Sequence, residues 1–280
     1  MDEIAVTPSF SRVTPLIDTH CHLDAKRFDE DRDEVLQRAW SAGVGGIVIP
    51  AVGPKDWEAL LELPLREPRV QVGLGIHPQL LPVIPEAEDE EHLERLDALL
   101  ARGVACAVGE CGLDGPSVEG APMERQLRVL RGHFALARKH GLPVLLHCLR
   151  THPALVEFLK SEPFPEAGVL LHSYSGGPDL AKFYAARGCH FSFAGPITFN
   201  EARKPLNALK AVPLERLLLE TDAPDQAPHP HRGERNEPGW LPLVAEAAAK
   251  ALEVPLEELA ARTTDTAKRL FRRPFGMESG

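Results

Sequence analysis

Two histidines near the start of the chain, His20 and His22, have the spacing of a metal-binding pair. They lie in LIDTHCHLD, residues 16–24, a stretch apolar enough to enter a core. In a β-strand, residues i and i+2 point to the same face, so the two imidazoles could hold one divalent ion. Cys21 then points to the opposite face and is expected in the core. Taken alone, the pair fits surface or hydrogen-bonded histidines equally well.

Four further residues with metal-binding side chains interrupt apolar runs later in the chain: Glu110, His147, His172 and Asp222. Burying such groups without partners is costly, and bound metal ions would offset that cost. Neutral imidazoles and carboxylates suit Zn²⁺, Mn²⁺ or similar ions. With the histidine pair they match a two-metal site, bridged by one carboxylate, that activates water and clamps an attacked phosphoryl or carbonyl group.

Eight short apolar runs predict eight buried strands. Amphipathic helical patterns recur between many of them, and the alternation predicts an α/β fold, a (β/α)8 TIM barrel, with a doubly wound open sheet as the alternative. Barrel active sites lie at the C-terminal ends of the strands, where the candidate ligands fall. The predicted strands are 16–22, 45–52, 70–78, 105–114, 143–148, 168–174, 190–195 and 217–224, and the predicted helices are 27–43, 90–103, 123–141, 178–188, 201–212, 240–253 and two short pieces, 256–262 and 265–273.

No domain boundary is visible, so we expect one barrel domain over residues 1–280 with a short N-terminal extension, 1–15. The chain has no transmembrane-length apolar run, and its acidic N-terminus does not read as a secretory signal. Five cysteines without a CxxC pair indicate reduced thiols and a cytoplasmic location. The net charge of −10 is a poor field for a polyanion, so a nucleic-acid substrate would need local positive charge, such as bound metal ions.

Seven motifs occur in a characteristic order: THCHLD, GIHP, GECGLD, LPVLLHC, LLHSYSGG, ETDAP and RGERNEP. With them the chain resembles the TatD-type metal-dependent deoxyribonucleases, within the amidohydrolase-like metal-dependent hydrolases, from about residue 16 to residue 272. The resemblance implies a TIM barrel, two divalent ions (Mg²⁺, Mn²⁺ or Zn²⁺) and hydrolysis of DNA phosphodiester bonds.

The resemblance also implies roles for the candidate ligands. One ion would be held by His20, His22, Glu110 and Asp222, and the second by His147, His172 and the bridging Glu110. Asp222 would accept the proton of the attacking water, which makes Asp222 and Glu110 the expected catalytic residues. Departures from the family pattern concern the pocket rim and hence substrate preference: Gly115 follows Asp114, Ser173 and Tyr174 follow His172, and Ala223, Pro224 and Asp225 follow Asp222.

Substrate contacts are expected from residues near these motifs, because arginines suit phosphates and the others end strands or line loops. The candidates are His77, Arg150, Tyr174, Ser175, Arg235 and Asn236, with Arg232 beside them. We expect single-stranded DNA or DNA ends as the substrate, no membrane association and no stable protein partner.

Two other functions remain open from the sequence. One is an amide or ester hydrolase on the same barrel, acting for example on a D-aminoacyl ester; related barrels often bridge the metals with a carbamylated lysine, whereas the fourth run offers Glu110. The other is a non-catalytic metal-binding relative, which a complete set of six ligands disfavours.

Overall fold

Eight parallel strands, each paired with the next in sequence order, form the centre of the structure. The computed structural model describes residues 14–276. The strands are β1 (Leu16–Asp18), β2 (Val44–Pro50), β3 (Val70–Leu74), β4 (Ala107–Asp114), β5 (Val144–Leu149), β6 (Val169–Leu171), β7 (Cys189–Phe193) and β8 (Leu217–Leu219). Their backbones are buried on both faces, as expected for strands covered by helices.

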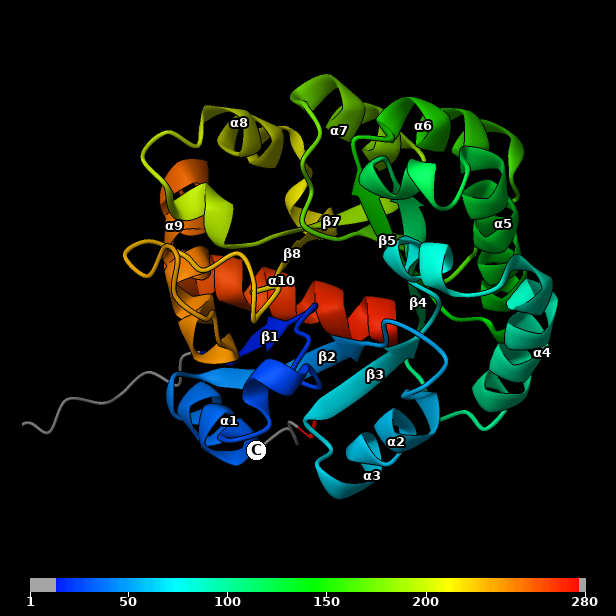
Figure 1. Cartoon of the computed structure of the whole chain (residues 1–280). Helices are drawn as coiled ribbons and strands as arrows, with labels where there is room; N and C mark the ends of the chain where they lie inside the picture. Colours follow the sequence, from blue (N-terminus) through cyan, green and yellow to red (C-terminus); the bar gives the residue numbers. More distant parts are fainter. Residues whose placement is uncertain (1–13, 277–280) are drawn as a thin grey trace, which may run out of the picture.

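The helices lie around the strands and follow them in turn (Figure 1). Their apolar stripes pack on the outward-facing side chains of the strands in one large core. The helices are α1 (Arg32–Ser41), α2 (Trp57–Leu61), α3 (Leu63–Arg66), α4 (Asp89–Leu100), α5 (Met123–His140), α6 (His152–Ser161), α7 (Pro178–Ala186), α8 (Arg203–Ala211), α9 (Leu241–Leu252) and α10 (Leu256–Phe271).

The first and last strands are joined by backbone hydrogen bonds just beyond their ends. The Thr19 amide donates to the Leu219 carbonyl, and the His22 amide donates to the Ala223 carbonyl at 2.7 Å. The Asp222 amide donates in return to the His20 carbonyl at 2.9 Å. These bonds nearly close the sheet into a barrel, which confirms the predicted fold.

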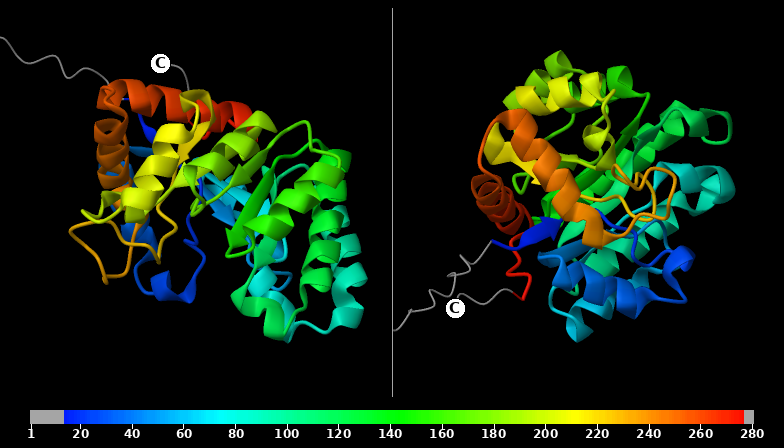
Figure 2. Two further views of the ribbon diagram at one scale, coloured as in Figure 1. Left: turned by 90° about the horizontal axis from the view of Figure 1, so that it is seen from above. Right: turned by 90° about the vertical axis from the view of Figure 1, so that its left-hand side faces the viewer.

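Helix α10 closes the N-terminal end of the barrel. Its Leu270 and Phe271, with Phe275 after it, pack on inward-facing strand residues such as Val48 and Leu218. Figure 1 shows α10 crossing behind the strands, and the left view in Figure 2 places it at the end opposite the orange loop that follows β8. The candidate site residues lie at the other end of the barrel, at or just beyond the C-terminal ends of the strands.

Several predicted elements differ from the structure. The first strand ends at Asp18, so His20 and His22 lie in the segment after it. The two short C-terminal pieces form one helix, α10, while α2, α3 and α6 had no counterpart among the predicted helices. Most of the predicted extension 1–15 lies outside the described residues. No helix within residues 14–276 is long and apolar enough to cross a membrane.

Candidate metal centre

Both histidines of the opening motif turn toward the barrel axis although they lie beyond β1. Asp18, fully buried, holds this segment against the one after β8: its carboxylate accepts from the Thr221 hydroxyl at 2.6 Å and the Thr221 amide at 3.0 Å. Burial raises the pKa of Asp18 to about 8 despite these bonds. The ring nitrogens Nε2 of His20 and His22 are 3.2 Å apart, and the Asp222 carboxylate lies 3.7 and 3.8 Å from them.

Glu110, on β4, lies between two groups of imidazoles. Its Oε2 atom is 3.2 Å from His20 Nε2 and 3.5 Å from His22 Nε2. Its Oε1 atom is 2.8 Å from His172 Nε2 and 3.0 Å from His147 Nδ1. One carboxylate therefore presents each of its oxygens to a different group, which is the arrangement that a bridging ligand requires.

Gly112 explains why the GECGLD motif needs its second glycine. It has a φ of +150°, and a Cβ atom there would lie 2.0 Å from the His147 carbonyl oxygen. Without a side chain at Gly112, β4 and β5 can approach closely, and Gly112 pairs directly with His147. The close approach brings Glu110 and His147 within hydrogen-bonding distance.

His77 belongs to this cluster. It caps the turn after β3 by accepting the Gln79 amide with Nδ1 at 3.1 Å, and its Nε2 lies 3.0 Å from Glu110 Oε1. His77 Nε2 is also 3.3 Å from His147 Nδ1. The sequence placed His77 among substrate contacts, whereas the structure brings it as close to Glu110 as the predicted ligands.

Asp114 fixes the orientation of His147. Its Oδ2 atom accepts from His147 Nε2 at 3.0 Å, which leaves Nδ1 of the ring facing Glu110. Asp114 is itself fixed by the hydroxyl and amide of Ser117, at 2.7 and 2.9 Å, and by Gln79. A carboxylate behind a metal-binding imidazole sets the tautomer of the ring and increases its basicity.

Glu220 is a buried carboxylate that was not among the residues predicted for the site. It accepts hydrogen bonds from the Ser192 hydroxyl and from the Ser173 amide, and its Oε1 lies 3.6 Å from His172 Nδ1. It stands two residues before Asp222, so the alternation of side chains that makes Leu218 face the barrel interior could have identified it.

The histidines around Glu110 favour the ionised form of its carboxylate. Burial alone would raise the pKa of Glu110, but His77, His172 and His20 hold it well below its usual range. Burial likewise opposes protonation of His172, yet Glu110 and Glu220 raise the pKa of this ring. Burial lowers the pKa of His22 to about 3, with His20 contributing. Burial raises the pKa of Asp222 to about 6 although His172 and His20 favour its charged form.

These residues fit divalent metal ions. Three groups each bring ligand atoms within 4.8 Å of one another: His20, His22 and Asp222; His77, Glu110 and His147; and His20, Glu110 and His172. Glu110 Oε2 is buried without a hydrogen-bond donor, so it has a lone pair free for a cation. The ring nitrogens of His20 and His22, and of His147 and His172, lie 3.2 and 3.3 Å apart, which suits two ligands of one ion at metal–nitrogen distances of about 2.0–2.1 Å.

The other predicted substrate contacts lie outside this cluster. Arg150 and Ser175 are exposed in the segments after β5 and β6. Arg235 is tied to the Asp31 carboxylate by two bonds of 2.7 Å. Tyr174 is buried, with its hydroxyl donating to Gly177 and its ring against Phe191.

Asn236 is fully buried and supports the loop after β8. Its side-chain amide donates to the carbonyls of Thr221 and Asp225 at 2.8 and 2.7 Å. Its contacts are therefore with the backbone around Asp222.

Comparison with known proteins gives this cluster a context. The family model described as TatD related DNase matches residues 17–272. The chain is 36% identical to the uncharacterized metal-dependent hydrolase YabD of Bacillus subtilis over 92% of this chain and 99% of that one. It is 31% identical to the 3′-5′ ssDNA/RNA exonuclease TatD of Cronobacter sakazakii, over 91% and 97% of the two chains. The crystal structure of YjjV, a TatD homologue from Escherichia coli, superimposes with a TM-score of 0.87 at 34% identity, covering 94% of this chain and 100% of that one. The chain therefore belongs to the TatD-related DNase family of metal-dependent hydrolases.

Proposed function

We propose that this chain is a phosphodiesterase that hydrolyses DNA with two divalent metal ions. The observation that carries the proposal is the position of Glu110, whose two oxygens face two separate groups of metal-binding side chains. Two ions about 3.5–4 Å apart, sharing a carboxylate, are typical of enzymes that displace a phosphoryl oxygen.

The ligand groups suggest which residues would hold each ion. His20, His22, Asp222 and Glu110 would hold one. Glu110, His147 and His172 would hold the other, and His77 lies close enough to contribute to it. Mg²⁺, Mn²⁺ and Zn²⁺ are the candidate ions, since imidazole and carboxylate ligands suit the last two and phosphate chemistry commonly uses the first.

When bound, such ions would lower the pKa of a water molecule and neutralise the phosphoryl oxygens. Asp222 is placed to accept the proton of that water, because its carboxylate lies beside His20 and His22 in the first ligand group and a carboxylate next to such a water can act as its base. The Oδ2 atom of Asp222 accepts a hydrogen bond from the Gln226 side-chain amide, which fixes the orientation of the carboxylate. The water oxygen bonds to phosphorus, one bridging P–O bond breaks, and the leaving oxygen takes up a proton.

The substrate assignment rests on the relatives and on the bridge. Several relatives are named 3′-5′ ssDNA/RNA exonucleases, which favours single strands or strand ends over duplex DNA and leaves RNA as a further substrate. Glu110 would bridge the two ions, whereas many amide-hydrolysing barrels use a modified lysine for that role, so the phosphodiesterase is preferred over the aminoacyl ester hydrolase.

A cleavage assay with a metal panel tests the proposal. The metal-depleted protein is assayed with Mg²⁺, Mn²⁺ or Zn²⁺ on a fluorescent single-stranded oligonucleotide and on a D-aminoacyl ester. We expect metal-dependent cleavage of the oligonucleotide and none of the ester. Cleavage of the ester alone would contradict the proposal.

Asp222→Asn tests the assigned base, with Asp265→Asn as its control at an exposed position on α10, at the opposite end of the barrel. The first variant should lose at least about 100-fold in kcat, as expected for removal of a general base. The control should stay within about twofold. Wild-type cleavage by Asp222→Asn would show that another group accepts the proton.

A further inference from the structure

A hollow of about 310 Å³ adjoins the metal centre on the side of the loop after β8. Its wall includes Gln226, whose side-chain amide donates to the Asp222 carboxylate, and Pro224, two residues after Asp222. The volume is at the lower end of that seen for small-molecule sites and suits one nucleotide rather than a base pair.

The hollow contains a ready platform for a flat ring. Phe199, half-buried, lines it, and the Arg232 guanidinium lies over the Phe199 ring at 4.5 Å from its centroid. Aromatic rings and guanidinium planes are the surfaces on which proteins stack unpaired bases, without regard to sequence.

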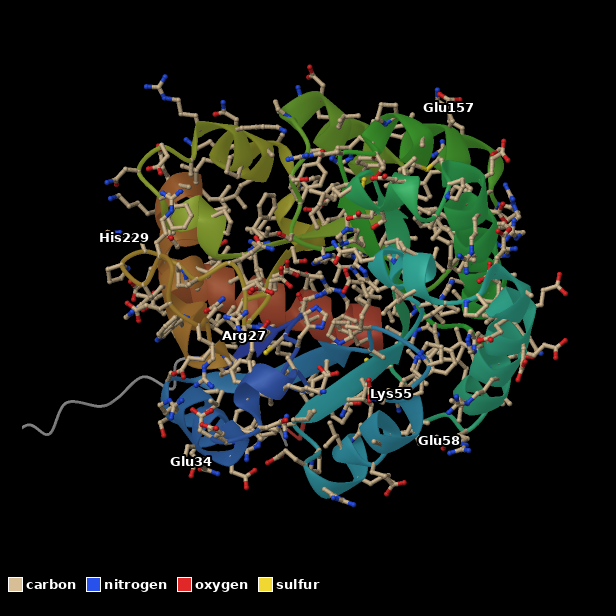
Figure 3. All side chains as sticks on the ribbon, in the orientation of Figure 1. Arg27, Glu34, Lys55, Glu58, Glu157 and His229 are labelled. Carbon is tan, nitrogen blue, oxygen red and sulfur yellow. The ribbon has the colours of Figure 1, made fainter. Side chains whose placement is uncertain are left out.

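Two arginines at the hollow are available for phosphate. Arg27 pairs with Asp225 at 2.8 Å, and Arg232 pairs with Glu201 at 2.6 Å. All four side chains are at least half exposed, and such surface pairs contribute little stability. A phosphodiester can therefore displace either carboxylate at low cost. Figure 3 labels Arg27, which lies on the segment after β1 and bonds to Asp225 in the loop after β8.

The loop that forms the hollow is fixed against its neighbour. Gly195 lies so close to the Gln226 backbone that a Cβ atom there would be 1.9 Å from the Gln226 carbonyl oxygen. The His229 amide donates to the Thr198 hydroxyl at 2.7 Å, next to Phe199. The hollow is thus formed by anchored backbone beside Asp222.

We propose that this hollow binds one unpaired nucleotide of the substrate strand, with its base stacked on the platform formed by Phe199 and Arg232 and its phosphate within reach of Arg27. The inference rests on the proposed phosphodiesterase function and adds the reason for a single-strand preference. A base held in a duplex cannot enter a hollow of this size, so the site selects strands whose bases are free.

Phe199→Leu is the test variant, because leucine keeps much of the volume and removes the ring face. Arg131→Ala, on the outer face of α5, is the control. Each protein is assayed on a short single strand, on the same strand with an abasic nucleotide at successive positions, and on methyl 4-nitrophenyl phosphate. The Kd of the strand is measured separately by fluorescence anisotropy.

Stacking of one base on an aromatic side chain contributes about 1–3 kcal/mol to binding. We therefore expect the loss of this stacking to raise the Kd of the strand about tenfold. An abasic nucleotide at one position should raise the KM of the wild-type enzyme about tenfold. Phe199→Leu should raise the Kd and KM of the intact strand by the same factor, with no further rise for that abasic strand. Its ratio of kcat/KM for the strand to that for the small diester should fall accordingly.

Equal KM and Kd for Phe199→Leu and the wild type would overturn the nucleotide site. The site would also be overturned if the rise in KM caused by Phe199→Leu and the rise caused by an abasic nucleotide multiplied at every position of the strand. The Phe199 ring would then not support a base. If the wild type cleaves neither the strand nor the small diester, the proposed function fails instead, which is a separate result from either of these.

Discussion

Glu110 shows how a single buried residue organises the candidate centre. Its carboxylate is almost fully buried, yet imidazoles from the ends of β1, β3, β5 and β6 converge on it. A carboxylate that stays ionised under such burial needs cations around it, whether protonated histidines or metal ions. The need to surround the Glu110 carboxylate with cations or metal ligands therefore explains why histidines lie at or just beyond the ends of all four strands.

Replacing Asp114 with asparagine should weaken the centre without touching it directly. Asparagine has one acceptor oxygen where the carboxylate has two, so it cannot accept from both His147 Nε2 and Ser117, and its neutral oxygen holds the ring less firmly. We expect the affinity for Mn²⁺ to fall about 10–100-fold, measured by titrating metal against activity. Asp33→Asn, at an exposed position on α1, is the control. Unchanged affinity would mean that Asp114 does not orient His147.

The sequence indicated six candidate ligands because each interrupts an apolar run, and the structure brings all six close together. The sequence could not place His77 in the cluster, since a histidine before a proline has no strand periodicity to indicate its direction. It also passed over Glu220, which lies in the same motif as Asp222. Tyr174 was selected because it follows His172 closely and Asn236 because it stands beside Arg235, but both side chains are buried, which depends on packing between distant segments.

Among the elements, α10 has a role that its sequence did not show. Its pattern appeared broken at Thr263 and Thr264, yet the helix is continuous. The Thr263 hydroxyl bonds back to the Leu259 carbonyl, and the Thr264 hydroxyl donates to the Pro15 carbonyl. With their hydroxyls satisfied, both threonines are buried in the helix, a tertiary effect that propensity cannot reveal.

Removing the Phe275 ring should destabilise the barrel at its closed end. Phe275 is fully buried and lies against Gly46, where a Cβ atom would be 2.6 Å from the ring. We expect Phe275→Ala to lower the free energy of unfolding by about 3–5 kcal/mol in urea titrations. Leu65→Ala, at a side chain that is 67% exposed, should change it by less than about 0.5 kcal/mol. Similar values for the two variants would contradict the packing described.

His133 links α5 to the end of β3 and should make stability depend on pH. It is fully buried, accepts the Ile76 amide at 3.0 Å, and burial lowers its pKa to about 4 although the Val129 carbonyl favours protonation. Between about pH 6.5 and 4 the unfolded chain takes up a proton that the folded chain refuses, so stability falls as the pH falls.

The wild type should therefore lose about 2 kcal/mol more than His133→Gln when unfolding is measured at pH 7 and again at pH 5. Glutamine can still accept the Ile76 amide, so the comparison isolates the titration. Parallel losses in the two proteins would show that His133 is not the group responsible.

The whole molecule is acidic, and positive charge beside the candidate site comes from a few arginines such as Arg27 and Arg232. The net charge is −10, and the arginines near the mouth are few. If two of these arginines neutralise substrate phosphates, the logarithm of the binding constant for a single strand should fall only gently with the logarithm of the salt concentration. We expect the KM for an oligonucleotide to rise by less than about tenfold between 50 and 200 mM salt. A much steeper rise would reveal a longer cationic track than the structure suggests.

The barrel as a whole was predictable because eight buried runs recur with helices between many of them, and parallel strands constrain where their ends meet. The elements least visible to periodicity, α2, α3 and α6, are those that were missed. Short helices such as α2 and α3 offer too few turns for an apolar stripe to stand out.

The number of metal ions bound per chain decides whether Glu110 bridges a two-metal centre. The protein is loaded with Mn²⁺, freed of excess metal and analysed for ions per chain, alongside Glu110→Gln and the cleavage rate of each. We expect about two ions per wild-type chain, fewer in Glu110→Gln, and cleavage of single-stranded DNA that requires both ions. Less than one ion per wild-type chain under excess metal, or full cleavage by Glu110→Gln, would contradict a two-metal centre bridged by Glu110.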